Sequence, residues 1–161
     1  MKQDRFLIGI LVGIGVLIVI ALTLFFVRKD TQTYVSEDTP EGVVRNYVLA
    51  VLNKDYQKAY SYLADKEHKP TYDQFRQAFF SGMVSPTNVG VNVGKAQVDG
   101  DAAVVELGLV YSPNDPFSTG YQNQDRALLT KQNGAWKLTS LPYNFWLYEW
   151  YQVTPQAPKV P

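Results

Sequence analysis

The side chains best suited to acid–base chemistry gather in the charged stretch from Asp65 to Pro70, DKEHKP. It contains His68, the only histidine of the chain, and a histidine can exchange a proton near neutral pH. Asp65 or Glu67 would act as a base only if a cavity raised its pKa, and the charged neighbours argue against such burial. We therefore expect His68 to be a solvated loop residue without a catalytic role.

Other acidic and phenolic groups are spread along the chain. Glu106 lies between two apolar residues of a strand-like run; it could point into the interior, but we expect it to face outward. Several tyrosines could offer phenol donors to a pocket, although we expect their rings to pack in the core with the hydroxyl at the surface. These tyrosines are Tyr47, Tyr60, Tyr62 and Tyr72.

The familiar motifs of catalysis and metal binding are missing from the sequence. It has no Gly-rich phosphate loop, no nucleophile elbow, and no His/Asp/Glu cluster at metal-ligand spacing. It has no cysteine either, which rules out disulfides, thiolate metal sites and covalently attached haem. We therefore predict a protein that is not an enzyme, with no catalytic or metal-binding residues and no cofactor.

Charge argues against a nucleic-acid partner. Residues 1–30 hold four of the 15 basic and two of the 15 acidic residues, so the remainder carries 11 basic and 13 acidic residues, a net charge of −2. A nucleic-acid surface needs a basic face.

The longest apolar run of the chain decides whether the protein is anchored in a membrane. Residues 6–27 are 22 residues without a charge. A helix of this length is about 33 Å long and can cross a hydrocarbon core of about 30 Å. Secretory signals have a shorter apolar core and a small-x-small cleavage site, whereas this run ends in Phe25-Phe26-Val27. We predict an uncleaved single-pass anchor in the plasma (inner) membrane.

Orientation and packing of the anchor are less strongly encoded. Two basic residues precede the span and two follow it, so the positive-inside rule gives a tie. The short N-terminal tail favours an N-inside orientation, with the C-terminal domain extracytoplasmic. Gly9 and Gly13 form a GxxxG pair, which leaves a groove for a partner helix, although glycine is also simply common in membrane helices.

Three helices are expected between residues 39 and 82. The first begins at Thr39-Pro40-Glu41, where threonine caps, proline takes the first helical position and the acid faces the dipole. Apolar residues then recur at 3-4 spacing from Val43 to Leu52. A second helix is expected from Asp55 to Ala64, and a third begins at Pro70-Thr71.

After Pro86 the apolar period changes from 3.6 to 2, which predicts strands. The first expected strand begins at Val89, and the second returns from Ala103 to Tyr111 after an Asp-Gly-Asp turn. The third spans 121–131, and Asn133-Gly134 is a strong hairpin signal leading into the fourth, 136–141. The predicted fold class is α+β: a transmembrane helix, then three helices and a curved antiparallel four-strand sheet.

This order of elements resembles the nuclear-transport-factor-like cone of the SnoaL/ketosteroid-isomerase superfamily, particularly its membrane-anchored bacterial members. The resemblance covers about residues 39–141 and rests on the helix start at Thr39-Pro40, the helix around Asp55-Tyr56 and Ala59-Tyr60, and the terminal Gly134-Ala135-Trp136. It implies a fold more than an activity, because the superfamily includes isomerases, hydrolases, ligand binders and many accessory domains.

Aromatic residues crowd the end of the predicted domain. Residues 143–151 contain six aromatics in nine positions, more than one core face of a helix or strand requires. The segment could close the open end of the cone, contact a partner protein, or form a belt at the membrane lipid surface. The candidate contact residues are Phe145, Trp146, Tyr148, Trp150 and Tyr151.

These elements predict a chain organised as an anchor, a linker, a cone-like domain and a Pro-rich extended tail, at residues 1–29, 30–38, 39–152 and 153–161. We expect a non-catalytic accessory or adaptor subunit of a larger integral membrane protein complex, of energy-converting or secretion type, with a homo-oligomer possible. The bitopic assembly component of type IV secretion systems shares this architecture. The alternative is a membrane-tethered small-molecule-binding domain or enzyme with a pocket inside the cone.

Overall fold

The computed structural model describes residues 3–27, 33–113 and 119–152, and the chain divides into two compact units between Thr33 and Tyr34. The first unit is helix α1 (Gln3–Val27). Its stretch Phe6–Leu24 is long and apolar enough to cross a membrane, and its side chains are exposed along the whole stretch. These properties are those expected of a single-pass anchor, by length and composition.

Three short helices open the second unit: α2 (Pro40–Leu52), α3 (Tyr56–Ser61) and α4 (Tyr72–Phe80). Each begins at a side chain that accepts a backbone N–H: Thr39 from Gly42, Asp55 from Lys58, and Thr71 from Gln74 in a capping box. The predicted helix starts are therefore confirmed.

Helix α3 ends three residues earlier than the sequence predicts, because the next residues pair with a strand. Leu63 forms a parallel bridge with Leu138, in which the Ala64 N–H donates to the Leu138 carbonyl and the Leu138 N–H to the Tyr62 carbonyl, both at 2.8 Å. The pairing of Leu63 with Leu138 therefore takes the place of the last turn predicted for this helix.

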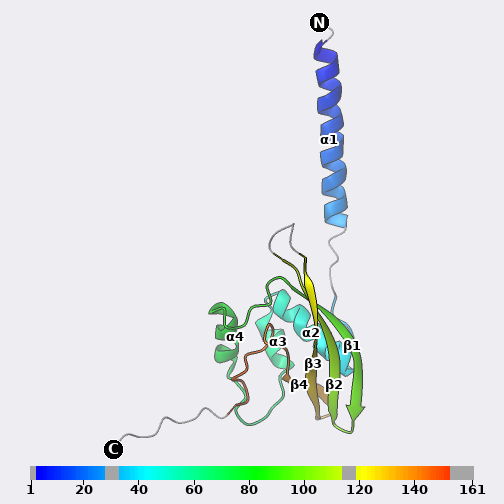
Figure 1. Ribbon diagram of the computed structural model, residues 1–161. Coiled ribbons are helices and arrows are strands. Elements are labelled where there is room, and N and C mark those ends of the chain that lie inside the picture. The colour runs from blue at the N-terminus through cyan, green and yellow to red at the C-terminus, as the bar shows by residue number, and fades with distance from the viewer. Residues whose placement is uncertain (1–2, 28–32, 114–118, 153–161) are drawn as a thin grey trace, which may run out of the picture. The chain divides into compact units, whose positions relative to one another are not determined.

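The sheet is a four-stranded antiparallel meander in the order β1 (Val89–Asp99), β2 (Ala102–Tyr111), β3 (Tyr121–Gln132) and β4 (Ala135–Ser140) (Figure 1). The β3–β4 turn has positive φ at Asn133 (50°) and Gly134 (81°), as a type I′ hairpin requires. Register shifts within β1 and between β3 and β4 accompany the curvature of the sheet. The α+β fold class is as predicted.

The core lies between the helices and one face of the sheet, with α2 in contact with β1, β2 and β4. Alternate residues of β2 from Ala103 to Leu109 are buried and face the helices, whereas Glu106 is exposed on the other face. From α2, Val43, Val44 and Tyr47 are almost completely buried against them. The predicted outward position of Glu106 is confirmed.

Residues 34–38, which the sequence places in a linker, are fastened to the domain. The buried Asn46 side chain accepts from the Val35 N–H and donates to the Val35 carbonyl, both at 2.8 Å. A Cβ on Gly42 would collide with the Ser36 carbonyl oxygen, so glycine permits the close approach of this segment. Residues 30–32 of the predicted linker lie outside the described residues.

A charged cluster adds a second fastening point. The Glu37 carboxylate accepts from Lys58 Nζ at 2.8 Å and from the Tyr62 hydroxyl at 2.7 Å. The hydrogen bond from Lys58 lowers the pKa of Glu37, while burial raises the pKa of Tyr62 to about 12. The domain therefore begins at residue 34.

Candidate functional site

The aromatic segment, residues 142–152, forms consecutive turns. It is neither a helix nor a strand, the two conformations considered in the sequence analysis. The Phe145 N–H donates to the Pro142 carbonyl at 2.9 Å, and the Trp150 N–H to the Leu147 carbonyl at 3.1 Å. Tyr151 adopts a positive φ of 65°. Turns aim successive side chains in different directions, so one short segment can fill the core and still reach the surface.

Three of its six aromatic side chains close the end of the helix–sheet interior. Phe145, Trp146 and Trp150 are between 0% and 6% exposed. The Trp150 ring lies 4.9 Å from that of Phe75, and the Trp146 ring 6.2 Å from that of Tyr47, measured between centroids. This burial favours the interpretation in which the segment closes the cone.

Three phenol hydroxyls fasten the segment to the rest of the domain. Tyr47 donates to the Phe145 carbonyl at 2.7 Å, Tyr151 to the Ala64 carbonyl at 2.6 Å, and Tyr111 to the Asn144 side chain at 2.9 Å. The Tyr47 hydroxyl is thus buried, which corrects the expectation that it reaches the surface. Burial raises the pKa of Tyr47 and of Tyr151 above their usual range, and raises that of Tyr111 to about 12.

Of the five predicted contact residues, Tyr148 is the one with a freely exposed ring, at 80%. Tyr151 is half-buried, and the other three belong to the core, where their rings contact the protein's own side chains. The sequence could not separate these roles, because it fixed neither the turns nor the direction of each side chain. Contact with a partner stays a prediction.

Tyr148 belongs to a group of four tyrosines at the surface, of which it alone was a predicted contact residue. Tyr121 stacks on Tyr111 at 4.5 Å between ring centroids, and the Tyr111 and Tyr143 hydroxyl oxygens are 3.5 Å apart. Tyr143 and Tyr148 line one small cavity of about 200 Å³. We call Tyr111, Tyr121, Tyr143 and Tyr148 the tyrosine patch; the last three are 61%, 67% and 80% exposed.

The interior between helices and sheet offers little polar chemistry. Among the described residues, the buried polar side chains are Asn46 and Asn144, and both have hydrogen-bond partners. Within that same part of the chain, no group of three or more His, Cys, Asp or Glu residues could hold a metal ion. The core between helices and sheet contains apolar and aromatic side chains, including Phe75, Phe145 and Trp146.

His68 lies in an exposed loop, as predicted, but the loop is not remote from the rest of the fold. Its carbonyl accepts the Tyr151 N–H at 3.2 Å, and its Nε2 lies 3.5 Å from the Glu67 carboxylate. This contact joins the loop to the aromatic segment and forms one end of a groove.

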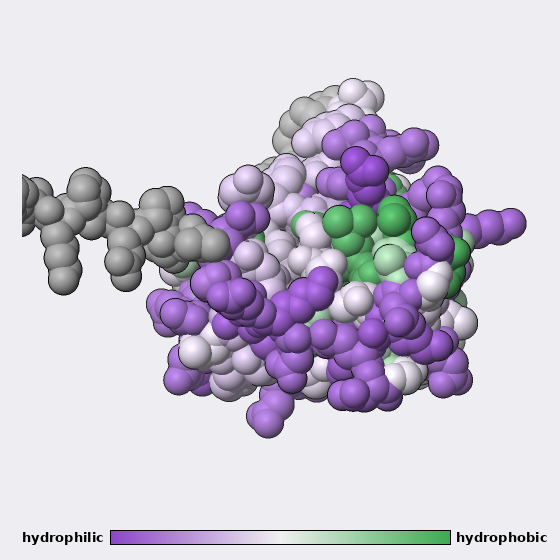
Figure 2. Space-filling view, turned by 90° about the horizontal axis from the view of Figure 1, so that it is seen from below, coloured by the Kyte–Doolittle hydropathy of each residue, from purple (hydrophilic) through white to green (hydrophobic). Residues whose placement is uncertain are grey.

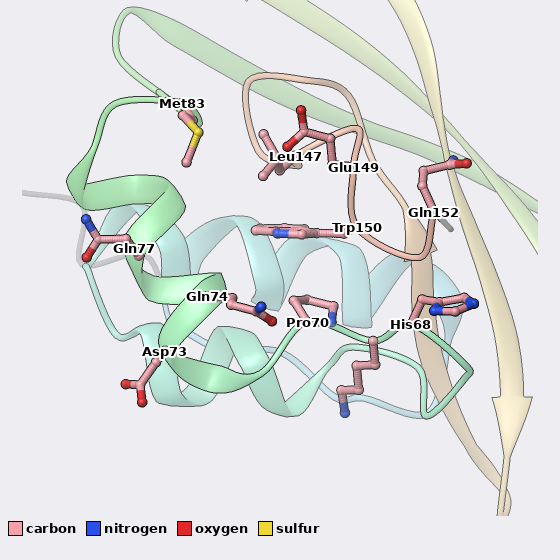
Figure 3. A pocket seen from close by; sticks show the side chains of 11 residues that line it. His68, Pro70, Asp73, Gln74, Gln77, Met83, Leu147, Glu149, Trp150 and Gln152 are labelled. Atoms are coloured by element: carbon pink, nitrogen blue, oxygen red, sulfur yellow. The ribbon is translucent and has the colours of Figure 1, made fainter. Parts of the chain in front are cut away.

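A groove between α4 and the aromatic segment is not predicted by the sequence. It encloses about 680 Å³ and opens to solvent. Helix α4 contributes Asp73 and Gln77 to one wall, and Leu147 and Glu149 line the other (Figure 3). The Trp150 ring lies midway between these walls. The face of the domain seen in Figure 2 is largely hydrophilic, with one compact hydrophobic area.

The glycine pair of α1, Gly9 and Gly13, is four residues apart in the helix and so lies on one face of it. The contact with a partner helix predicted for this pair stays a prediction.

Comparisons with known proteins give fold neighbours at low identity. No family model matches the chain, and no curated protein matches it. A SEC-C motif-containing protein from Rhodopseudomonas palustris is 17% identical over 66% of this chain and 79% of its own, with a TM-score of 0.47. An NTF2-like transpeptidase from Campylobacter jejuni is 15% identical over 62% and 96%, at 0.41.

A third neighbour is an LEH-like epoxide hydrolase from M. tuberculosis, which is 17% identical over 69% of this chain and 86% of its own, with a TM-score of 0.37. The neighbours thus include a protein of the NTF2-like type. Scores below 0.5 carry no argument about activity, and membership of the superfamily stays a prediction.

Proposed function

We propose that this chain is a non-catalytic, single-pass accessory or adaptor subunit of a larger membrane protein complex, of energy-converting or secretion type. Its folded unit docks extramembrane partner proteins, and α1 holds it in the membrane. The observation that carries this proposal is the apolar, aromatic core between the helices and the sheet. Where a pocket enzyme keeps an open cavity with a few convergent polar groups, this domain packs Phe75, Phe145, Trp146 and Trp150.

Because the described core is apolar, we place the docking function at the surface of the domain. The tyrosine patch supports a docking role, because tyrosine is enriched at protein interfaces, where its ring buries apolar area and its hydroxyl still finds a polar partner. Tyr121, Tyr143 and Tyr148 are all more than 60% exposed. Tyr111 contacts both Tyr121 and Tyr143, and Tyr143 and Tyr148 line the same cavity, so we treat the four as one surface.

The membrane helix supports the second half of the proposal. Its exposed Gly9 and Gly13 offer a close approach to another helix in lipid, where small residues favour helix association. With the apolar core, these features support a subunit over the alternative, a membrane-tethered domain that binds or transforms a small molecule inside the cone.

Affinity isolation from mildly solubilised membranes tests the docking role. Extramembrane partners, which dock on the folded unit, should copurify with the full chain but not with residues 1–33 fused to an unrelated soluble domain. A triple Tyr121→Ser, Tyr143→Ser, Tyr148→Ser variant should lose them. The matched control is Phe80→Ser, which removes an aromatic ring that is 62% exposed on α4, outside the patch. Equal recovery with the triple variant would refute docking through the tyrosine patch.

A further inference from the structure

Two tyrosines lie opposite each other where strand β2 ends and strand β3 begins. Tyr111 and Tyr121 are direct register partners in this antiparallel pair of strands. Their rings stack, with centroids 4.5 Å apart and planes inclined by 11°. Side chains directly opposite each other on one face of a sheet lie close together, so the pairing of the strands holds the two phenols in contact.

One ring of this pair is fixed at its hydroxyl end, and the other is open to solvent. Tyr111 donates a hydrogen bond to the Oδ1 atom of the buried Asn144 at 2.9 Å. Tyr121, which stacks on it, is 61% exposed. A small reagent dissolved in water can therefore reach the pair, while the hydrogen bond to Asn144 keeps the Tyr111 ring in its place.

Stacked phenols have the geometry that oxidative coupling requires. Removing one electron and one proton from a phenol gives a phenoxyl radical, whose unpaired electron is shared with the ring carbons next to the oxygen-bearing carbon. Two such radicals join through a bond between these carbons. The combining orbitals are π orbitals, so the bond forms perpendicular to the ring planes. Face-to-face contact therefore places the reacting carbons near the geometry of attack.

Two pairs of tyrosine rings are in contact within the described part of the chain, and they differ in geometry. The rings of Tyr60 and Tyr72 are 5.5 Å apart between centroids and inclined by 71°, so they meet edge to face. The stacked pair is ten positions apart in the sequence and the edge-to-face pair twelve. Loop closure alone would bring the two pairs together about equally often, so the fold decides which pair can couple.

We propose that Tyr111 and Tyr121 form an oxidative modification site, at which a one-electron oxidant converts the stacked pair into a dityrosine cross-link. The chain has no cysteine and so has no disulfide with which to join two strands. The cross-link would fasten β2 to β3 on either side of the segment that connects them. The proposal does not rest on the adaptor role, because it concerns the purified chain alone.

The reaction balances with a peroxide as the terminal oxidant. Each of the two O–H bonds gives one electron to the oxidant and one proton to water, and a carbon–carbon bond joins the two rings. The joined carbons then lose their protons, and the two oxygens take up protons from water, which restores both phenols. The protein becomes lighter by two hydrogen atoms, and hydrogen peroxide accepts the two electrons and two protons to give two molecules of water.

Photo-oxidation of the purified full chain in detergent tests this proposal. Illuminated tris(bipyridyl)ruthenium with persulfate is a small one-electron oxidant, and dityrosine is detected by its blue fluorescence. Asp-N protease cleaves before Asp115, so peptides 101–114 and 115–124 stay joined only when the two tyrosines are cross-linked. Cleavage before Asp65 separates the edge-to-face pair in the same way. Trypsin keeps the stacked pair in one peptide, 96–126, so a cross-link within one chain appears as that peptide lighter by two hydrogens.

We expect at least about tenfold more Tyr111–Tyr121 product than Tyr60–Tyr72 product in the folded chain, and about equal amounts in concentrated urea. Tyr121→Phe should abolish the first product. Tyr148→Phe, the matched control at another exposed ring of the tyrosine patch, should leave it unchanged.

Three results would overturn the proposal. Equal yields of the two products in the folded chain would show that stacking gives no advantage. A ratio that is the same in urea would mean that sequence proximity alone explains the coupling. A cross-link that joins only separate chains, with no lightened 96–126 peptide, would show that the stacked pair does not react within the fold.

Discussion

Replacing Tyr47 by phenylalanine removes one oxygen atom from the contact that holds the aromatic segment against α2. The hydroxyl is completely buried and donates to the Phe145 carbonyl at 2.7 Å, across 98 residues of sequence. The ring contacts with Phe75 and Trp146 remain in the variant. The change therefore costs one buried hydrogen bond and leaves a carbonyl without this donor, about 1–3 kcal/mol of the free energy of unfolding.

Urea unfolding of the full chain in a non-ionic detergent measures this loss. Tryptophan fluorescence reports on the folded unit alone, because Trp136, Trp146 and Trp150 all lie in it. With an m-value of about 1–3 kcal/mol/M, the midpoint should fall by roughly 1 M. The matched control is Tyr148→Phe, whose ring is 80% exposed and which should change stability by less than about 0.5 kcal/mol. A Tyr47→Phe variant as stable as the control would refute the proposed fastening.

The pH dependence of the stability difference between the natural chain and the Tyr47→Phe variant gives an independent check. Burial raises the pKa of Tyr47 well above the ordinary value of about 10, so the unfolded chain loses this proton first. Above pH 10 the unfolded state therefore binds fewer protons, and stability falls by up to about 1.4 kcal/mol per pH unit from this residue. The Phe variant lacks this loss, so its deficit relative to the natural chain should shrink as the pH rises above 10. A stability deficit that stays constant above pH 10 would contradict the burial of the Tyr47 hydroxyl.

Three other variants test the remaining parts of the account. Gly9→Leu with Gly13→Leu should reduce copurification of membrane partners, while Gly15→Leu, on another face of α1 with equally open surroundings, should not; equal losses would argue against the GxxxG groove. Asn46→Ala leaves the Val35 N–H and carbonyl without their partner and should cost about 1–3 kcal/mol in the urea assay, and a neutral result would show that residues 34–38 are not fastened. A cysteine introduced at the exposed Gln97 should react with a membrane-impermeant maleimide in intact cells if the domain is extracytoplasmic, and labelling only after lysis would reverse that orientation.

The helices and strands were accessible from the sequence because their signals are local. Thr39 and Thr71 cap the helices that follow them within three residues, and Asn133-Gly134 closes a hairpin by its own backbone preference. Residue spacing then separated helical from strand segments, and the alternation around Glu106 placed its side chain outside.

The candidate site was less accessible, because distant residues decide its geometry. The turns of the aromatic segment depend on Tyr47, and α3 ends at Ser61 because Leu63 pairs with Leu138. No local pattern distinguishes the buried Trp150 from the exposed Tyr148. The groove beside Trp150 arises only once α4 and the aromatic segment are packed together.

Native gel electrophoresis of gently solubilised membranes tests the central claim, that this chain is a subunit of a larger membrane complex, most directly. The band that contains the protein is excised and its other components are identified by mass spectrometry. The account predicts reproducible co-migration with a defined complex far larger than the 18.2 kDa chain. A band at the mass of a monomer or homodimer would contradict the adaptor role and redirect attention to a ligand-binding domain.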